Sequence, residues 1–192
     1  MSELLFIRHA ETDMAGTFCG HSDPELNERG RAQLAELIRR MSAENIGVVY
    51  SSDLRRAHAT GRAISEAFGV DCSVRPALRE IDFGQWEGLA WKEIERRDET
   101  YARRWIAEHP LLPAPGGEDF CDFERRILDE VKSLSMEAKA KGCDIAVVTH
   151  AGVLRTVLCR LHGCAKGEAW EQTRSYCSIA RLNSHLGIAG QR

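Results

Sequence analysis

The chain lacks long apolar runs. No hydrophobic run approaches the ~20 residues that a membrane helix requires. The apolar run at residues 4–7 follows an acidic residue and precedes a basic one, which is unlike the core of a secretory signal peptide. We therefore expect no membrane span and no membrane partner.

Paired cysteines are also lacking. The seven cysteines are scattered, odd in number and without a CxxC pair. Such usage is typical of a reducing compartment, so we expect a cytoplasmic location. Cys159, His162 and Cys164 lie close together in the sequence, but they lack the second ligand pair of a structural zinc site. We expect no metal there.

Lysine is scarce, with 5 Lys against 21 Arg, although the formal net charge is only −3. This balance argues against nucleic acid as a partner, so any basic site must be local. The planar fork of arginine suits phosphate or carboxylate, although genome composition also explains an arginine excess. The 192 residues, 43% hydrophobic and 29% charged, predict one compact domain over residues 1–192.

Strand and helix patterns alternate along the chain. Apolar runs predict buried strands at residues 4–8, 46–50 and 143–148, with a weaker one at 176–182. Helical spacing predicts helices at 27–41, after the turn at 51–53, at 119–141 and at 153–161, with polar helical stretches at 91–97 and 100–108. The alternation predicts an α/β fold.

Ionisable residues stand where the predicted strands end. Arg8 and His9 follow the first strand, the turn at 51–55 follows the second, and His150 follows the third. A loop rich in glycine, acidic and aromatic residues contains Glu80 and is the candidate for a fourth wall of the same site. Because ligands of open α/β sheets bind at the carboxyl ends of the strands, we expect these residues to share one crevice.

These side chains predict phosphoryl transfer without a metal. A neutral imidazole can attack phosphorus, so His9 is the candidate nucleophile and would form a phosphohistidine. Arg8 and Arg55 would bind the phosphoryl oxygens, together with the amides of Ala151 and Gly152 at a helix start. The site would therefore hold a phosphomonoester.

His150 would act in this site as a cation. Glu80 is the candidate acid and base, because a carboxyl kept protonated by anionic neighbours can protonate a leaving alkoxide and later accept a proton from water. Asp82 is the second candidate. Each residue alone also has a structural interpretation; Arg55, for example, could pair with Asp53 or Glu80. Their joint placement favours a phosphate site.

Six motifs resemble those of the histidine phosphatase superfamily, in its phosphoglycerate mutase-like branch. They are LFIRHAET at 5–12, GHSDPELNERG at 20–30, SSDLRRA at 51–57, LREIDFGQWEG at 78–88, PGGE at 115–118 and THAGVLR at 149–155. They occur in family order over nearly the whole chain. The resemblance implies a three-layer α/β/α sandwich with a mostly parallel sheet, and a reaction that uses no metal or organic cofactor.

Position by position, the resemblance implies roles for five residues. It places the phosphorylated histidine at His9, the phosphate-binding arginines at Arg8 and Arg55, the second histidine at His150 and the proton donor at Glu80. This agrees with the interpretation of the residues themselves.

The sequence departs from the family pattern in two places. Ala10 replaces the usual glycine after the histidine, and Ala15 stands where an asparagine is often found. One common phosphate ligand is thus absent or replaced. Thr12 or Thr17 could supply a hydroxyl, but each is equally well explained as a turn residue.

The length favours hydrolysis of a small phosphorylated metabolite over a mutase reaction, because the phosphoglycerate mutases of the family carry longer insertions. The segment WEGLAW at 86–91 with the later PGGE resembles the α-ribazole phosphatase group of cobalamin biosynthesis. The candidate substrate is therefore α-ribazole 5′-phosphate. A broad-specificity phosphatase and a phosphoglycerate mutase are alternatives, and a non-catalytic phosphate-binding module is the alternative from another class.

Residues 86–115 would form a cap segment over the leaving group. Trp86, Trp91 and Trp105 would stack on a base or simply pack the cap. A homodimer is compatible with the sequence.

Overall fold

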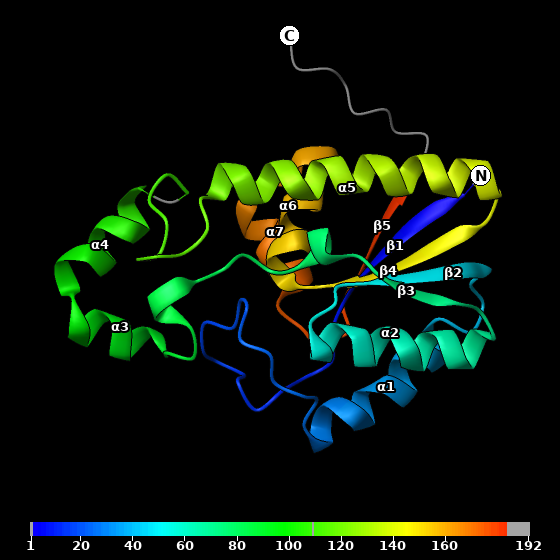
Figure 1. Cartoon of the computed structure of the whole chain (residues 1–192), viewed down its shortest axis with the longest axis horizontal. Helices are drawn as coiled ribbons and strands as arrows, with labels where there is room; N and C mark the ends of the chain where they lie inside the picture. Colours follow the sequence, from blue (N-terminus) through cyan, green and yellow to red (C-terminus); the bar gives the residue numbers. More distant parts are fainter. Residues whose placement is uncertain (1, 109, 184–192) are drawn as a thin grey trace, which may run out of the picture.

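The first strand explains why the sheet is covered on both sides. β1 (Glu3–Arg8) buries Leu4 and Phe6 in one core and Leu5 and Ile7 in another. Successive side chains of a strand point to opposite faces, so a continuous apolar run needs packing on each face. The computed structural model describes residues 2–108 and 110–183 and provides a layer of helices on each face (Figure 1).

Within the described residues, five strands form one sheet in the order β3-β2-β4-β1-β5. The parallel strands are β1, β2 (Ile46–Ser51), β3 (Cys72–Val74) and β4 (Asp144–Thr149), whereas β5 (Ile179–Asn183) pairs with β1 in the antiparallel sense. The predicted α/β sandwich with a mostly parallel sheet is confirmed. Residues 1, 109 and 184–192 of the predicted domain lie outside the described part.

Helices of the two outer layers begin and end where the sequence gives the signals. α1 (Glu28–Arg40) starts after Asn27, whose side chain accepts a hydrogen bond from the Gly30 amide at 2.7 Å. α2 (Arg55–Phe68) shares its face of the sheet with α1. α5 (Phe120–Lys141), α6 (Ala151–Leu161) and α7 (Lys166–Thr173) cover the other face.

The predicted cap segment folds as two helices with a small core of their own. α3 (Trp91–Arg97) and α4 (Glu99–Glu108) lie at one end of the molecule, away from the sheet (Figure 1). Trp86 and Ile94 are buried there with Ala102 and Ala114, in a cluster separate from the two sheet cores. Two short 3-10 turns, η1 (Pro76–Leu78) and η2 (Gly84–Trp86), lead from the sheet to the cap.

Two elements were not expected from the sequence, namely β3 and α7. β3 has only three residues at a sheet edge, and α7 carries just two buried side chains, Ala169 and Thr173. Such short elements give no periodic signal. No helix in the described ranges is long and apolar enough to cross a membrane.

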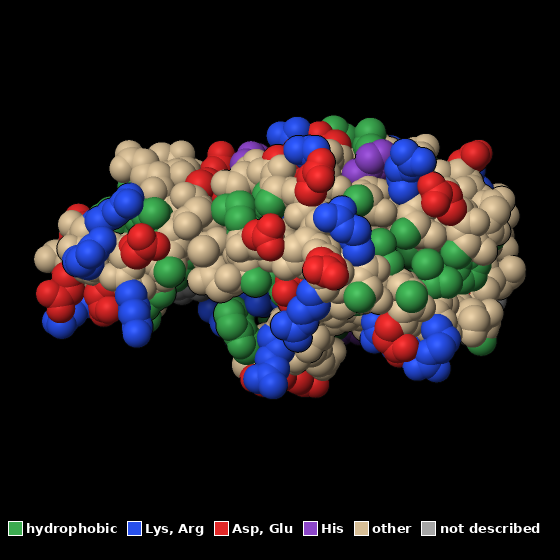
Figure 2. Space-filling model, turned by 90° about the horizontal axis from the view of Figure 1, so that it is seen from below, with side chains coloured by type: hydrophobic (Ala, Val, Ile, Leu, Met, Phe, Trp, Pro, Cys, Tyr) green, Lys and Arg blue, Asp and Glu red, His purple; other side chains and the backbone are tan. Residues whose placement is uncertain are grey.

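Acidic and basic side chains are intermixed over the face of the molecule shown in Figure 2. This view carries no broad field of one sign. The distribution agrees with the near-neutral charge of the whole chain.

The separate cap core gives a stability prediction. Ile127→Ala removes a fully buried side chain from a sheet core, so it should lower the free energy of unfolding by about 2–5 kcal/mol. Ile94→Ala makes the same change in the cap, so we expect earlier proteolysis within residues 86–115 and a smaller shift of the urea midpoint. Equal midpoint shifts in the two variants would contradict an independently packed cap.

Candidate active site

A cavity of about 870 Å³ opens where the central strands end. Arg8 and His9 line it from the end of β1, Ala151 from the start of α6, and Glu80 from the loop before η2. The sheet thus brings together four of the six predicted site residues at one wall. This is the place predicted from the carboxyl ends of parallel strands.

His9 is buried with a defined arrangement of its ring nitrogens. Nδ1 lies 2.7 Å from the Ala10 carbonyl oxygen, and because a carbonyl only accepts, Nδ1 carries the proton. Nε2 then bears the lone pair, and the Nε–H of Arg56 donates to it at 3.3 Å. Burial, followed by the charges of Arg56 and Arg8, holds the pKa of His9 well below its usual value. The ring is therefore neutral at pH 7, as a nucleophile requires.

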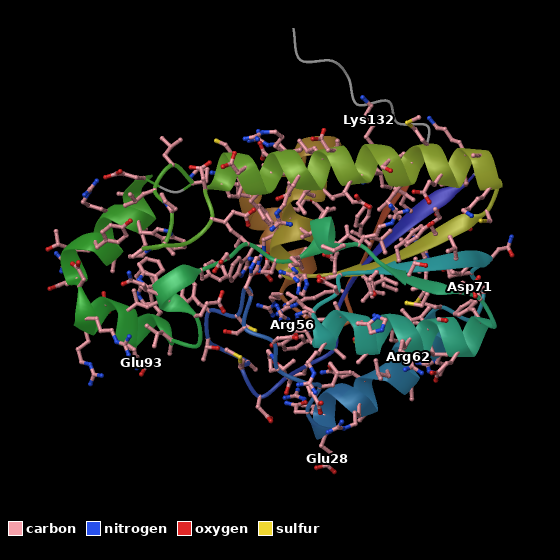
Figure 3. The ribbon with its side chains drawn as sticks, viewed as in Figure 1. Glu28, Arg56, Arg62, Asp71, Glu93 and Lys132 are labelled. Atoms are coloured by element: carbon pink, nitrogen blue, oxygen red, sulfur yellow. The ribbon has the colours of Figure 1, made fainter. Side chains whose placement is uncertain are left out.

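The arginine beside His9 is Arg56, so the assignment of Arg55 is corrected. Arg55 points outward, with more than half of its side chain exposed, and pairs with Glu25. Arg56 is fully buried at the start of α2 and lies near the centre of the molecule in Figure 3. Its guanidinium donates to the carbonyls of Cys19 at 3.2 Å, Gly20 at 2.7 Å and Ser22 at 2.6 Å.

Helical periodicity contains the signal that distinguishes the two arginines. The buried positions of α2 are Arg56, Ala57, Thr60, Gly61 and Ile64, which follow the spacing of one helix face. Arg55 falls one position off this face. Continued back to the first turn, the buried face of α2 therefore includes Arg56 and leaves out Arg55.

Arg8 reaches the site from β1 and is anchored at the end of α7. Its Nη1 donates to the carbonyls of Thr173 at 3.0 Å and Arg174 at 2.6 Å. The guanidinium lies 4.1 Å from the ring centroid of Tyr176, a cation–π contact. Its buried Nε atom has no hydrogen-bond partner among the described residues, which leaves a donor for a bound anion.

His150 lies beside His9, with 5.1 Å between the two ring centroids. Its Nε2 is 3.0 Å from the Ser52 hydroxyl, and its buried Nδ1 has no partner in the described ranges. The expectation that His150 is a cation is wrong for this arrangement, because burial and then the charge of Arg56 hold its pKa well below the usual value. A neutral ring is present instead, with one nitrogen left for a ligand.

Glu80 is buried against the first turn of α6. Its Oε2 accepts a hydrogen bond from the Gly152 amide at 2.9 Å, and its Oε1 accepts from the Ile81 amide at 3.0 Å. A Cβ at position 152 would stand 2.1 Å from Glu80 Oε1, so only glycine allows this approach. The Gly152 amide is thus occupied by Glu80, and Ala151 is left as the predicted amide at the pocket wall.

The second candidate acid, Asp82, is engaged elsewhere. Its carboxylate lies 3.5 Å from His21 Nδ1 and accepts from the Gly84 amide at 2.8 Å. Thr12 and Thr17 likewise serve the turn around Met14, through the Met14 amide and carbonyl respectively. The Thr17 hydroxyl gives its proton to this turn, whereas the Thr12 hydroxyl only accepts there and keeps its own proton.

Glu87, which sequence reasoning did not single out, holds the loop that carries the Arg56 acceptors. Its carboxylate accepts from the amides of Gly20, His21, Ser22 and Phe83 at 2.8–3.1 Å. Burial alone would raise the pKa of Glu87, but hydrogen bonds from Ser22, Phe83 and His21 outweigh burial and lower it. In the peptide groups that join Cys19 to Gly20 and Gly20 to His21, Arg56 therefore binds the carbonyl and Glu87 binds the amide.

The described residues contain no group of three or more His, Cys, Asp or Glu side chains placed to hold a metal ion. Cys159 and Cys164 instead pack against the core beneath α6.

Known proteins are similar to this chain in both sequence and fold. The sequence profile of the histidine phosphatase superfamily (branch 1) matches residues 4–187. Phosphoserine phosphatase 1 of Hydrogenobacter thermophilus is 31% identical over 206 residues, which cover 97% of this chain and 95% of the relative. The metal-independent phosphoserine phosphatase of Arabidopsis thaliana is 35% identical over 166 residues, covering 84% of this chain and 69% of the relative.

Among solved structures, the α-ribazole phosphatase from Shigella flexneri is 26% identical. It superposes with a TM-score of 0.81 over 93% of this chain and 89% of its own. The chain belongs to branch 1 of the histidine phosphatase superfamily. It is a phosphatase, and the resemblance found in its motifs is confirmed.

The corrected arginine gives a matched pair of variants. Arg56→Met removes the donor to His9, so we expect kcat for p-nitrophenyl phosphate to fall by at least about 10²-fold. Arg55→Met breaks only an exposed ion pair and should stay within about twofold of wild type. Circular dichroism would check folding, and Arg56→Lys, which keeps the charge, would cover the case in which Arg56→Met does not fold. Equal losses in the Arg55 and Arg56 variants would restore the original assignment.

The lowered pKa of Glu87 gives a pH prediction. Its stabilising contribution is complete above the unfolded value of about 4.3 and is lost as pH falls through the lower folded value. The difference in melting temperature between wild type and Glu87→Gln should thus be constant above about pH 5 and shrink below about pH 4. Glu36→Gln serves as the control: the Arg39 hydrogen bond also lowers the pKa of Glu36, but solvent screens this exposed pair, so the melting temperature should change little at any pH. A difference that grows on acidification would refute the role of the carboxylate.

Proposed function

We propose that this chain hydrolyses a small phosphomonoester through a phosphohistidine on Nε2 of His9. The observation that carries the proposal is the neutral, Nδ1-protonated ring of His9 beside a buried Arg56. The Nε2 lone pair attacks phosphorus in line, the bond from phosphorus to the ester oxygen breaks, and Nδ1–H on Ala10 O supports the positive imidazolium that results.

Fixed donors around His9 suit the charge that develops on the phosphoryl oxygens. Arg8 and Arg56 supply two guanidinium groups, and Arg8 Nε and His150 Nδ1 are buried without partners among the described residues. A bound phosphoryl group would give both atoms a partner. Because these groups are held before any ligand arrives, little reorganisation accompanies the reaction.

Glu80 is the proposed proton donor to the leaving alkoxide. In the second step it accepts a proton from water, whose oxygen attacks phosphorus and releases His9 and inorganic phosphate. Its bonds to the Gly152 and Ile81 amides keep the carboxyl group at the pocket wall beside Ala151. No step requires a metal, which agrees with the metal-independent activity named for the Arabidopsis relative.

Two substrates have support. The α-ribazole 5′-phosphate suggested by the sequence is favoured by aromatic side chains at the cap end of the pocket, Phe18, Phe83, Trp91 and Trp105, and by the Shigella relative. Phosphoserine is favoured by the names of the Hydrogenobacter and Arabidopsis relatives. Either is a small phosphorylated metabolite that the cavity can hold.

A cytoplasmic location is also part of the proposal. All seven cysteines are free thiols; Cys121 is exposed, Cys177 is buried and the other five are partly exposed. A reducing compartment keeps such thiols unpaired.

The phosphohistidine is tested by hydrolysis of p-nitrophenyl phosphate in the presence of EDTA. Wild type should remain active, and His9→Ala should lose at least about 10³-fold in kcat. Mass spectrometry of rapidly quenched wild type should find an acid-labile phosphoryl group on the peptide that contains His9. Undiminished activity in His9→Ala would refute the mechanism.

A further inference from the structure

Arg155 is a cation in the active-site pocket without an acidic partner. It has no carboxylate within ion-pair distance among the described residues, a property it shares with Arg8 and Arg56 at the same site. Arg160 lines the pocket from the same helix, but it is paired with Glu124 at 2.5 Å. Arg155 has no ion-pair partner within the part of the chain that the structure describes, although Arg160 on the same wall has one. The charge of Arg155 is therefore available to a ligand.

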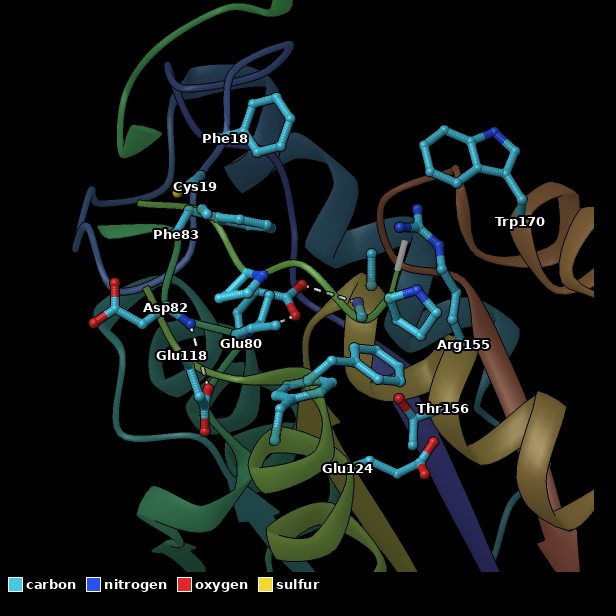
Figure 4. Close-up of a pocket in the computed structure, with 18 of the residues that line it drawn as sticks. Phe18, Cys19, Glu80, Asp82, Phe83, Glu118, Glu124, Arg155, Thr156 and Trp170 are labelled. Atoms are coloured by element: carbon cyan, nitrogen blue, oxygen red, sulfur yellow. Dashed lines mark hydrogen bonds between the residues drawn. The ribbon is translucent and has the colours of Figure 1, made fainter. Parts of the chain in front are cut away.

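The helix places Arg155 close to the phosphoryl position. It lies one turn after Ala151 on α6, about 6 Å along the helix axis. Both residues line the cavity. Figure 4 shows Arg155 beside Trp170 on one side of the pocket, with Phe18 and Phe83 on the other. A group bound by Arg155 would therefore belong to the part of the substrate next to the ester oxygen.

The plane of the guanidinium is fixed by two contacts. Nε donates to the Thr173 hydroxyl at 3.1 Å, and the central carbon lies 3.9 Å from the ring centroid of Trp170. The Thr173 carbonyl also accepts from Arg8, so one residue orients both arginines. Neither Nη atom of Arg155 donates to a protein group in the described ranges, and both are left for a planar acceptor.

We propose that Arg155 binds a carboxylate of the substrate, so that the pocket selects phosphorylated acids whose carboxylate lies close to the phosphate ester. The proposal rests on the proposed phosphatase function. A carboxylate matches both the plane and the single charge of the guanidinium. A neutral leaving group such as α-ribazole would cover Arg155 without compensating its charge, which is unfavourable.

The test uses substrate pairs that differ only in the carboxylate: 3-phosphoglycerate against glycerol 3-phosphate, and O-phosphoserine against O-phosphoethanolamine. Wild type should prefer the acid in each pair by about 10- to 100-fold in kcat/KM, the range of charge-assisted hydrogen bonds. Arg155→Met should bring this ratio close to one, Arg155→Lys should give an intermediate ratio, and Arg160→Met, the matched control, should keep the wild-type ratio.

A ratio near one in wild type, or an unchanged ratio in Arg155→Met, would overturn the proposal. Failure of the phosphohistidine mechanism is a separate result, because it appears as undiminished turnover in His9→Ala whatever the ratio. If no ester is hydrolysed, calorimetric affinities of wild type for the same pairs decide. Equal affinity for 3-phosphoglycerate and glycerol 3-phosphate would then overturn the carboxylate site, and Arg155→Lys covers the case in which Arg155→Met does not fold.

Discussion

The buried charge of Arg56 is the constraint on which the site depends. Among the described residues no carboxylate pairs with it. The carbonyls of Cys19, Gly20 and Ser22 accept from its guanidinium instead, and the amides of the same loop donate to Glu87. The peptide groups of this loop thus lie between the Arg56 cation and the Glu87 anion, and these hydrogen bonds polarise one another. This arrangement joins α2, the loop after β1 and the segment that leads to the cap.

Burial has a second effect, on the two histidines. His9 and His150 are neutral because desolvation and neighbouring arginines disfavour the imidazolium form. The positive charge of the site is therefore concentrated on guanidinium groups, which cannot lose a proton at working pH. The proposed nucleophile and the charged groups around it are thus of different residue types.

The sequence predicted most of the framework, because apolar runs and helix caps are local signals. β1, β2, β4 and the long α5 were found in this way, as were His9, Arg8 and Glu80 at the ends of elements. What it missed depends on contacts across the chain. The exception is Arg56, which the periodicity of α2 distinguishes from Arg55. No local pattern shows that Glu87 binds amides some 65 residues earlier. The protonation of His150 likewise depends on its neighbours in space.

The cap packs on its own core of Trp86, Ile94, Ala102 and Ala114, and this cluster contains no residue of the two sheet cores. The sheet and the cap helices are therefore packed around different clusters of the described residues. Phe18 joins the cap cluster from the loop after β1, next to the Cys19 and Gly20 carbonyls that accept from Arg56. A change in the packing of α3 or α4 would therefore reach Arg56 through this loop.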